Sequence, residues 1–283
     1  MDIAIISSEK DLASMNIRSS LLNNFDFRKS DEKFDNNESY NLKIGDNSVK
    51  LYLLNNEMIY ADDINKKINA DFFVFISRHV SKENTPAFTA HSIGNWGNAE
   101  FGGKSNTLCP SSAVFLKRVF LELAEKAKGK RGYETALEAT HHGPFIEKPA
   151  LFIEIGSAEK EWADESNGAI IAGTIIDSIK NNDKIAYSKN NDKIAIWLGG
   201  THYCNNFVKI AQRKNIAFSY ICPKHSLAKL DKNLLGEAIR KTEEKVDFAV
   251  LDWKGLGQEK QRIIQMLDKI GLKYERSDVL LKN

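Results

Sequence analysis

Cysteine and proline are scarce, and no long apolar run occurs. The three cysteines, Cys109, Cys204 and Cys222, are far apart and form no C-x-x-C pair. This usage fits a protein of the reducing cytoplasm. The apolar start of the chain is too short for a secretion signal, and no stretch of about 18 apolar residues is available to span a bilayer. We therefore expect no membrane segment.

The charges nearly cancel, with 40 Lys plus Arg against 38 Asp plus Glu in 283 residues, a formal net charge of +2. This balance, together with 42% hydrophobic residues, excludes a disordered chain or an acidic tail. Any nucleic-acid partner must therefore meet a local basic patch. The five prolines do not cluster, so no linker is visible and we predict a single domain over residues 1–283.

Short apolar runs alternate with longer segments of helical period, a pattern typical of α/β proteins. The predicted strands span residues 3–8, 49–54, 72–77, 135–140, 151–156, 194–198, 217–222 and 248–252. The predicted helices span residues 113–128, 162–180, 207–215, 233–245 and 258–270. Because unbroken apolar strands belong to sheets covered on both faces, we predict a three-layer αβα fold with a mainly parallel, mixed sheet. The polar segment 23–48 is predicted to be an insertion or hairpin beside it.

The six histidines are ordinary in number but not in placement. His91 lies in a long loop, whereas the other five directly follow predicted strands: His79, His141, His142, His202 and His225. In open α/β sheets, ligands bind outside the carboxyl ends of the strands, so these five are candidates for a site. Imidazole can serve there as a metal ligand, a general base or a donor to an oxyanion.

The spacing of the candidates allows a metal site without requiring one. Five residues can converge but match no compact zinc signature: Glu138, His141, His142, His202 and Asp252. Consecutive residues of a strand point to opposite faces, so His141 and His142 share one site only if the chain turns there. The following Gly143-Pro144 favours such a turn.

The glycine-rich segment 97–105 looks like a phosphate-binding loop, but an extra glycine precedes Lys104 and no apolar strand leads into it. We interpret these glycines as allowing the backbone to approach a ligand or a neighbouring loop closely. No G-x-S-x-G elbow occurs, so a serine hydrolase of the usual α/β type is not expected.

The richest basic patch lies on the predicted helix 113–128 and just beyond it. Its members are Lys117, Arg118, Lys126, Lys128, Lys130 and Arg131. Such a stripe can grip nucleic-acid phosphates, but lysines near a helix C-terminus also complement the helix dipole. The sequence leaves both interpretations open.

Several motifs at or near strand ends occur together in one order. In the first half they are Ser77-Arg78-His79, Thr89-Ala90-His91, Gly94-Asn95-Trp96-Gly97 and Phe101-Gly102-Gly103. In the second half they are Glu138-Ala139-Thr140-His141-His142-Gly143-Pro144, Gly199-Gly200-Thr201-His202-Tyr203 and Asp252-Trp253-Lys254-Gly255-Leu256. In this order and over almost the whole chain, they resemble the D-aminoacyl-tRNA deacylases of the archaeal and plant type.

The resemblance implies an esterase that separates a D-amino acid from the 3′ end of tRNA, with a fold similar to peptidyl-tRNA hydrolase and zinc as cofactor. It implies that His79, His91, His141, His142 and His202 line the site, with Glu138 near them, and leaves open which of them bind metal and which touch substrate. We predict that His141, His142, His202 and Glu138 are catalytic and that His141, His142 and His202 are metal ligands. The predicted substrate-binding residues are His79, His91, Asn95, Trp96, Gly102, Gly103 and Tyr203. The basic patch would bind tRNA charged with a D-amino acid, and a cytoplasmic monomer is expected.

The chain departs from the family pattern after the strand 217–222. Where the family has Gly-His-Ile and then a tyrosine, this chain has Ser219-Tyr220-Ile221 and then His225. Either Tyr220 or His225 would therefore replace the family histidine, or this position would only pack against the site. The alternatives to a deacylase are a zinc-dependent hydrolase of a small amide or ester, a peptidyl-tRNA hydrolase, and a non-enzymatic RNA-binding module.

Overall fold

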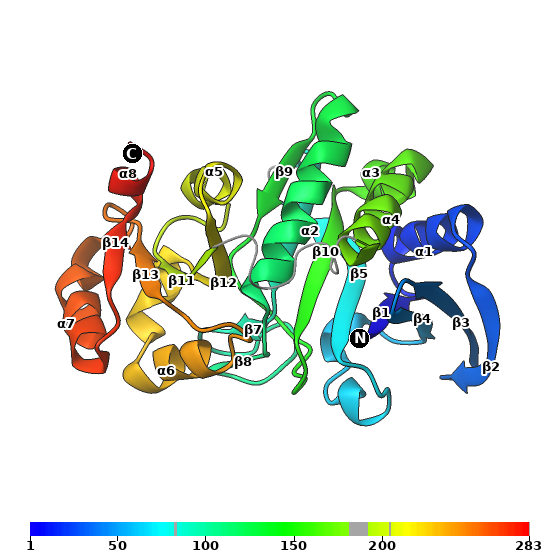
Figure 1. The fold of residues 1–283 in the computed structure, drawn as a ribbon, viewed down its shortest axis with the longest axis horizontal. Coiled ribbons are helices and arrows are strands. Elements are labelled where there is room, and N and C mark those ends of the chain that lie inside the picture. Colours follow the sequence, from blue (N-terminus) through cyan, green and yellow to red (C-terminus); the bar gives the residue numbers. More distant parts are fainter. Residues whose placement is uncertain (82–83, 181–191, 204, 283) are drawn as a thin grey trace.

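The computed structural model describes residues 1–81, 84–180, 192–203 and 205–282, and its described strands form two larger sheets and a small ribbon (Figure 1). The large sheet is mixed. Its strands lie in the order β2 (Arg28–Phe34), β3 (Asn37–Ile44), β4 (Asn47–Leu54), β1 (Asp2–Ser8), β5 (Phe72–Val80), β10 (Ala150–Ser157), β6 (Ala87–Ser92) and β9 (Glu134–Leu137). Strands β4, β1, β5 and β10 are parallel neighbours, and β6 runs antiparallel to β10.

The smaller sheet is parallel and lies beside the large one. Its order is β12 (Ile216–Cys222), β11 (Lys193–Leu198), β13 (Phe248–Leu251) and β14 (Tyr274–Arg276). The ribbon pairs β7 (Gly94–Asn95) with β8 (Thr107–Leu108). After β9 the chain leaves the large sheet, and the backbone amide of Ala139 donates to the carbonyl of His202 at 3.0 Å. The loop that follows β9 is thereby fixed against the loop that follows β11.

Alternation along the strands assigns each side chain of the large sheet to one of two faces. Ile3 and Ile5 pack with α1 (Leu12–Asn24), α2 (Ala113–Lys126) and α4 (Glu165–Lys180), whereas Ala4 and Ile6 belong to a separate core on the other face. That second face is covered by loops and by the short 3-10 helices η1 (Met58–Tyr60) and η2 (Ile64–Lys66). The candidate site lies on this loop-covered face.

Helices cover both faces of the smaller sheet. Helix α5 (Asn205–Arg213) packs on the face that carries Trp197, while α6 (Lys232–Arg240) and α7 (Lys260–Ile270) pack on the face that carries Ile196 and Leu198. The remaining described α-helices, α3 (Glu159–Ala163) and α8 (Ser277–Leu280), are short. The side chain of Ser112 caps α2 by accepting from the amide of Phe115, as its Pro-Ser-Ser start favours.

The predicted α/β class and mixed sheet are confirmed, and the polar segment 23–48 contains the β2–β3 hairpin, which forms the edge of the large sheet. Several boundaries differ. Helix α1 and strands β6 and β14 were not predicted, the strand predicted at 135–140 ends at Leu137, and the helix predicted at 162–180 is preceded by a separate short helix. The single domain and the likeness to peptidyl-tRNA hydrolase stay predictions.

Candidate active site

Three adjacent strands bring the first polar side chains of the site together. Glu154 on β10 is paired in register with Ser77 on β5 and with Thr89 on β6. Two residues further along the same two strands, His79 on β5 is paired with Gly156 on β10. A Cβ atom built on Gly156 would lie only 2.7 Å from Cδ2 of His79, so the glycine provides the space that this imidazole occupies.

Glu154 is a buried carboxylate with several donors around it. It accepts hydrogen bonds from the hydroxyls of Ser77 at 2.6 Å and Thr89 at 3.3 Å. Burial alone would raise the pKa of Glu154, but hydrogen bonds from His79 and His91 hold it well below its usual range. Glu154 therefore carries a negative charge inside the protein.

Glu138, just beyond β9, is a second buried carboxylate. Its Oε2 lies 2.7 Å from Nε2 of His202, and its Oε1 lies 3.1 Å from Nδ1 of His79. Burial opposes ionisation here as well, yet the contacts with His202 and His79 lower the pKa of Glu138 well below its usual value. The two carboxylates thus flank one imidazole.

His79 is the charge that balances this pair. Desolvation lowers its pKa, but the hydrogen bonds and charges of Glu138 and Glu154 outweigh burial and raise the pKa to about 10. At neutral pH, His79 is therefore an imidazolium. Its Nε2 contacts the hydroxyl of Tyr203, so the charged ring joins the β9 and β11 loops to the large sheet.

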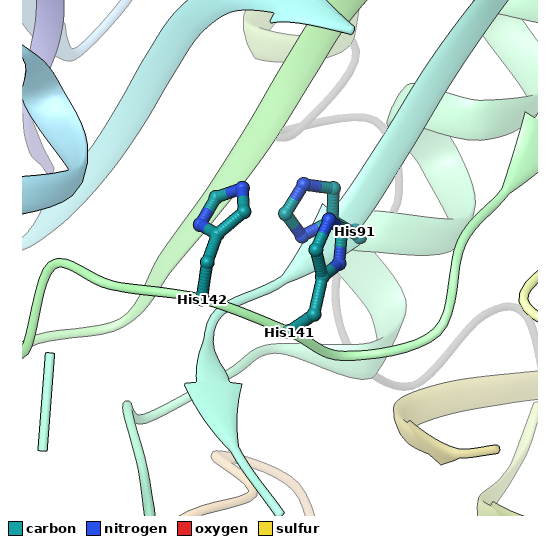
Figure 2. Close-up of side chains that lie close together, drawn as sticks. All are labelled: His91, His141 and His142. Atoms are coloured by element: carbon teal, nitrogen blue, oxygen red, sulfur yellow. The ribbon is translucent and has the colours of Figure 1, made fainter. Parts of the chain in front are cut away.

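A cluster of three histidines lies beside the carboxylates. His91 projects from β6, and His141 and His142 project from the loop after β9, so that their rings gather above that loop (Figure 2). The ring centroids of His91 and His141 are 4.1 Å apart, and those of His141 and His142 are 4.3 Å apart. The chain makes the turn that the double histidine requires, because His142 adopts a left-handed backbone with φ of 43°.

Each ring of this cluster contacts a backbone carbonyl through Nδ1. The acceptors are the carbonyls of Ser92, Ala139 and Gly143, at 3.0, 2.7 and 2.6 Å from His91, His141 and His142. A neutral imidazole that donates from Nδ1 keeps a lone pair on Nε2. Desolvation, reinforced by the neighbouring imidazoles, lowers the pKa of His142 to about 4 and that of His141 well below its usual value. Desolvation also acts on His91, but the adjacent Glu154 outweighs it and raises the pKa of His91.

Potential metal-ligand atoms gather in three groups among the described residues. The groups are His91 with His141 and His142, Glu138 with His141 and His202, and His79 with Glu138 and Glu154. Within each group the ligand atoms lie within 4.8 Å of one another. The structure thus divides the ligand set predicted from the sequence, because His142 and His202 lie in different groups that share His141.

These groups open into a pocket of about 690 Å³. Its inner wall is formed by His79, His141, His142, His202, Phe152 and Glu154. The pocket volume lies within the ~300–1,000 Å³ range of small-molecule sites. The arrangement therefore offers ionised carboxylates, a fixed imidazolium and neutral imidazoles around one cavity large enough for a small substrate.

Comparison with known proteins identifies the family. The model of the family described as D-aminoacyl-tRNA deacylase matches residues 66–275. The chain belongs to this family. D-aminoacyl-tRNA deacylases of Thermococcus kodakarensis and Thermococcus onnurineus are 37% and 39% identical over 280 residues, which cover 96% of this chain and 98% of each relative. The deacylase of Methanocaldococcus jannaschii is 33% identical and matched over its full length.

The fold of this deacylase-family chain also occurs in a crystal structure described as a conserved protein of unknown function. The two chains are 31% identical and superpose with a TM-score of 0.87, covering 100% of this chain and 97% of the other.

In this deacylase-family chain, four of the residues predicted to bind substrate make close contacts with the backbone of neighbouring loops and strands. The amide of Asn95 donates to the carbonyl of Gly102 at 3.0 Å, and Trp96 Nε1 donates to the carbonyl of Ile221 at 3.2 Å. Gly102 has φ of +73°, and a Cβ there would lie 1.8 Å from the carbonyl oxygen of Ile59. A Cβ on Gly103 would likewise come close to the backbone of Gly143. These glycines allow the close loop approach predicted from the sequence.

Tyr220 and His225, the two candidates to replace the family histidine, occupy different surroundings in this deacylase-family chain. Tyr220 is buried in the core of the smaller sheet, and its hydroxyl donates to the carbonyl of Cys109 at 2.6 Å. His225 is exposed, and desolvation together with the neighbouring His202, Lys229 and Lys224 lowers its pKa. His225 is thus the member of the pair that is close to the His202 side of the site. Asp252, another sequence candidate, packs against Gly255.

The basic patch lies on the helix-covered side of the large sheet, because α2 packs on the face opposite the histidine cluster. Most of its members are in ion pairs: Lys117 with Asp192, Lys126 with Asp177, Lys128 with Glu125 and Lys130 with Asp164. Arg118 is buried. A role of this patch in tRNA binding stays a prediction.

Sequence reasoning overlooked Glu154 and Thr89 as site residues. Glu154 is the single charged residue in the otherwise apolar segment Ala150–Gly156. A carboxylate in a strand buried on both faces must find partners, since its unpaired burial is costly. That isolated charge was the available signal.

Proposed function

We propose that this protein hydrolyses the ester bond that joins a D-amino acid to the 3′ end of tRNA, releasing the amino acid and the tRNA. The observation that supports this most directly is the pocket lined by His202, which is paired with buried Glu138, and by His141 and His142 of the histidine cluster. An aminoacyl ester is already activated, so its hydrolysis needs a positioned water, a base and stabilisation of the oxyanion.

His202 has the contacts of a general base. Its Nε2 donates to Glu138 at 2.7 Å, which leaves Nδ1 able to accept the proton of an attacking water. The same proton can then pass to the 3′ oxygen of the departing ribose. Glu138 orients the ring and stabilises the imidazolium that forms, as the carboxylate of a catalytic triad does.

His79 holds the carboxylates in place. Located between Glu138 and Glu154, it keeps both ionised and fixes the direction from which Glu138 meets His202. Because His79 stays protonated near pH 7, it acts as a positioning cation and not as a base.

The histidine cluster fits zinc. Nε2 of His91 is buried, lies 3.8 Å from Oε1 of Glu154 and makes no hydrogen bond of normal length, and all three rings use Nδ1 to contact carbonyls. This second-shell arrangement is typical of zinc-bound histidines, and three protein ligands are typical of catalytic zinc. We therefore assign zinc to His91, His141 and His142 and assign His202 to proton transfer. Bound zinc would supply an acidified water and polarise the ester carbonyl.

The partner follows from the substrate. Proteins of this family are named for their action on D-aminoacyl-tRNA, so charged tRNA is the macromolecule that we expect to dock at the pocket. Its use in translation leads us to propose a cytoplasmic location. None of the helices described is long and apolar enough to cross a membrane. The monomeric state stays a prediction.

A panel of tyrosyl substrates tests the reaction class. D-Tyr-tRNA, N-acetyl-Tyr-tRNA and tyrosine ethyl ester differ in the acyl group or the leaving group but share the side chain. We expect hydrolysis of D-Tyr-tRNA at the highest kcat/KM. Preferential cleavage of N-acetyl-Tyr-tRNA would instead indicate a peptidyl-tRNA hydrolase, and equal cleavage of the ethyl ester would indicate a small-ester hydrolase.

A further inference from the structure

Exposed apolar side chains gather at the mouth of the pocket. Among the described residues, eight large hydrophobic side chains are exposed, and three of them line this cavity: Tyr60, Val80 and Phe101, with exposed fractions of 59%, 67% and 63%. Exposed apolar side chains that cluster, in contrast to scattered ones, mark interaction sites. The pocket therefore has a polar inner wall of histidines and a rim on which these exposed apolar side chains lie beside the charged side chains of Lys10, Glu57 and Arg78.

Close backbone packing fixes the two aromatic residues of this rim. A Cβ on Gly102 would lie 3.3 Å from Cδ1 of Tyr60, so the Tyr60 ring lies beside the residue that follows Phe101. The carbonyl of Phe101 accepts a hydrogen bond of 3.0 Å from the amide of Gly143. Since Gly143 directly follows His142, the aromatic rim is tied to the loop that carries the histidine cluster.

We propose that Tyr60 and Phe101 provide stacking surfaces for the terminal adenine of the tRNA acceptor end. This inference rests on the proposed function. In an aminoacyl-tRNA the scissile ester is carried by the ribose of that adenosine, so the base must lie within one nucleoside of the histidines. The tRNA end is single-stranded, and proteins bind such unpaired bases by stacking them on aromatic side chains.

The shape of the pocket favours this occupant over a protein partner. Both rings line the same cavity of about 690 Å³ as His141 and His142, and a cavity of this size is typical of sites for small ligands. Stacking also suits the substrate class. All tRNAs share the terminal adenosine, so a platform for it serves every D-aminoacyl-tRNA whatever its amino acid.

Binding of a stable amide tests the platform without catalysis. The probe is 3′-deoxy-3′-(D-tyrosylamino)adenosine, and D-tyrosinamide serves as the ligand without a base. For wild-type protein, calorimetry should give tighter binding of the nucleoside. Tyr60→Ala and Phe101→Ala should each weaken nucleoside binding by about 5- to 100-fold, the equivalent of losing one stacking contact. Tyr274→Ala, at an exposed tyrosine remote in sequence, is the matched control and should bind like wild type.

The outcomes separate the platform from the proposed function. Loss of nucleoside binding in the two rim variants but not in Tyr274→Ala supports the platform, even if D-Tyr-tRNA is not hydrolysed and the proposed function fails. Equal binding of both ligands by wild type, or an equal loss for both ligands in the rim variants, overturns the platform even if hydrolysis is observed. A rise in KM for D-Tyr-tRNA, with kcat nearly constant, should accompany the first result.

Discussion

Replacing Gly156 by alanine would place a methyl group against the ring of His79. The new Cβ would lie 2.7 Å from Cδ2 and 3.2 Å from Cγ of the imidazole, whereas carbon atoms in contact prefer about 3.5–4.0 Å. The ring must therefore move by about 1 Å to restore normal contact. Such a shift disrupts the contacts of 3.1 and 3.4 Å between His79 and the two carboxylates, Glu138 and Glu154.

We expect Gly156→Ala to lower kcat for D-Tyr-tRNA about 100-fold, since misplacement of a supporting group by ~1 Å has an effect of this size. Overpacking should also lower the free energy of unfolding by about 1–3 kcal/mol. The assays are single-turnover deacylation and urea denaturation followed by circular dichroism.

Gly173→Ala is the matched control for this substitution. Its Cβ would meet Lys126 Cε at an ordinary 3.4 Å, at a half-buried position of helix α4 that faces α2. It should keep full activity and increase the free energy of unfolding by about 0.5–1 kcal/mol. Wild-type kcat in Gly156→Ala would refute the positioning role of His79.

Three further outcomes are expected. His202→Ala should lower kcat by about 10²- to 10⁴-fold with an unchanged circular dichroism spectrum, as for loss of a general base, and a wild-type kcat in this variant would contradict the assignment. The purified protein should bind zinc, and His91→Ala should lower the zinc content measured by atomic absorption, whereas undiminished zinc would exclude this ligand. Charge reversal at Lys128, Lys130 and Arg131 should weaken tRNA binding and flatten the salt dependence of that binding. An unchanged salt dependence would mean that these side chains are solvated and do not bind tRNA.

The helices and strands that the sequence predicts well are those whose apolar pattern matches the burial of their side chains in the structure. Strand β5 begins with an unbroken apolar run, and its start at Phe72 was predicted, whereas its end lies at Val80 and not at the predicted Ser77, so that His79 belongs to the strand. Helix α1 was missed because Ser, Asn and Arg interrupt its apolar positions, although its capping residue Asp11 was a usable signal. Strand β6 was missed because Thr89 and His91 make it look like a loop, and its pairing with β10 and β9 defines it.

The sequence predicted most of the residues that form the candidate site, but not which of them lie together. Strand-end histidines and family motifs identified His79, His141, His142 and His202. Which of them share a site depends on the register of β5, β10 and β6 and on the left-handed backbone of His142. Both are tertiary features, and no spacing rule encodes them. Pairing of His202 with Glu138 likewise requires the two loops that meet at the Ala139 amide.

The most direct test of the central claim compares D-Tyr-tRNA with L-Tyr-tRNA under identical conditions. Purified protein is incubated with each substrate, before and after removal of metal by a chelator, and the released amino acid is measured. We predict rapid hydrolysis of the D ester, little hydrolysis of the L ester, and loss of activity on chelation that added zinc restores. Failure to cleave D-Tyr-tRNA in the zinc-loaded state would contradict the proposed function.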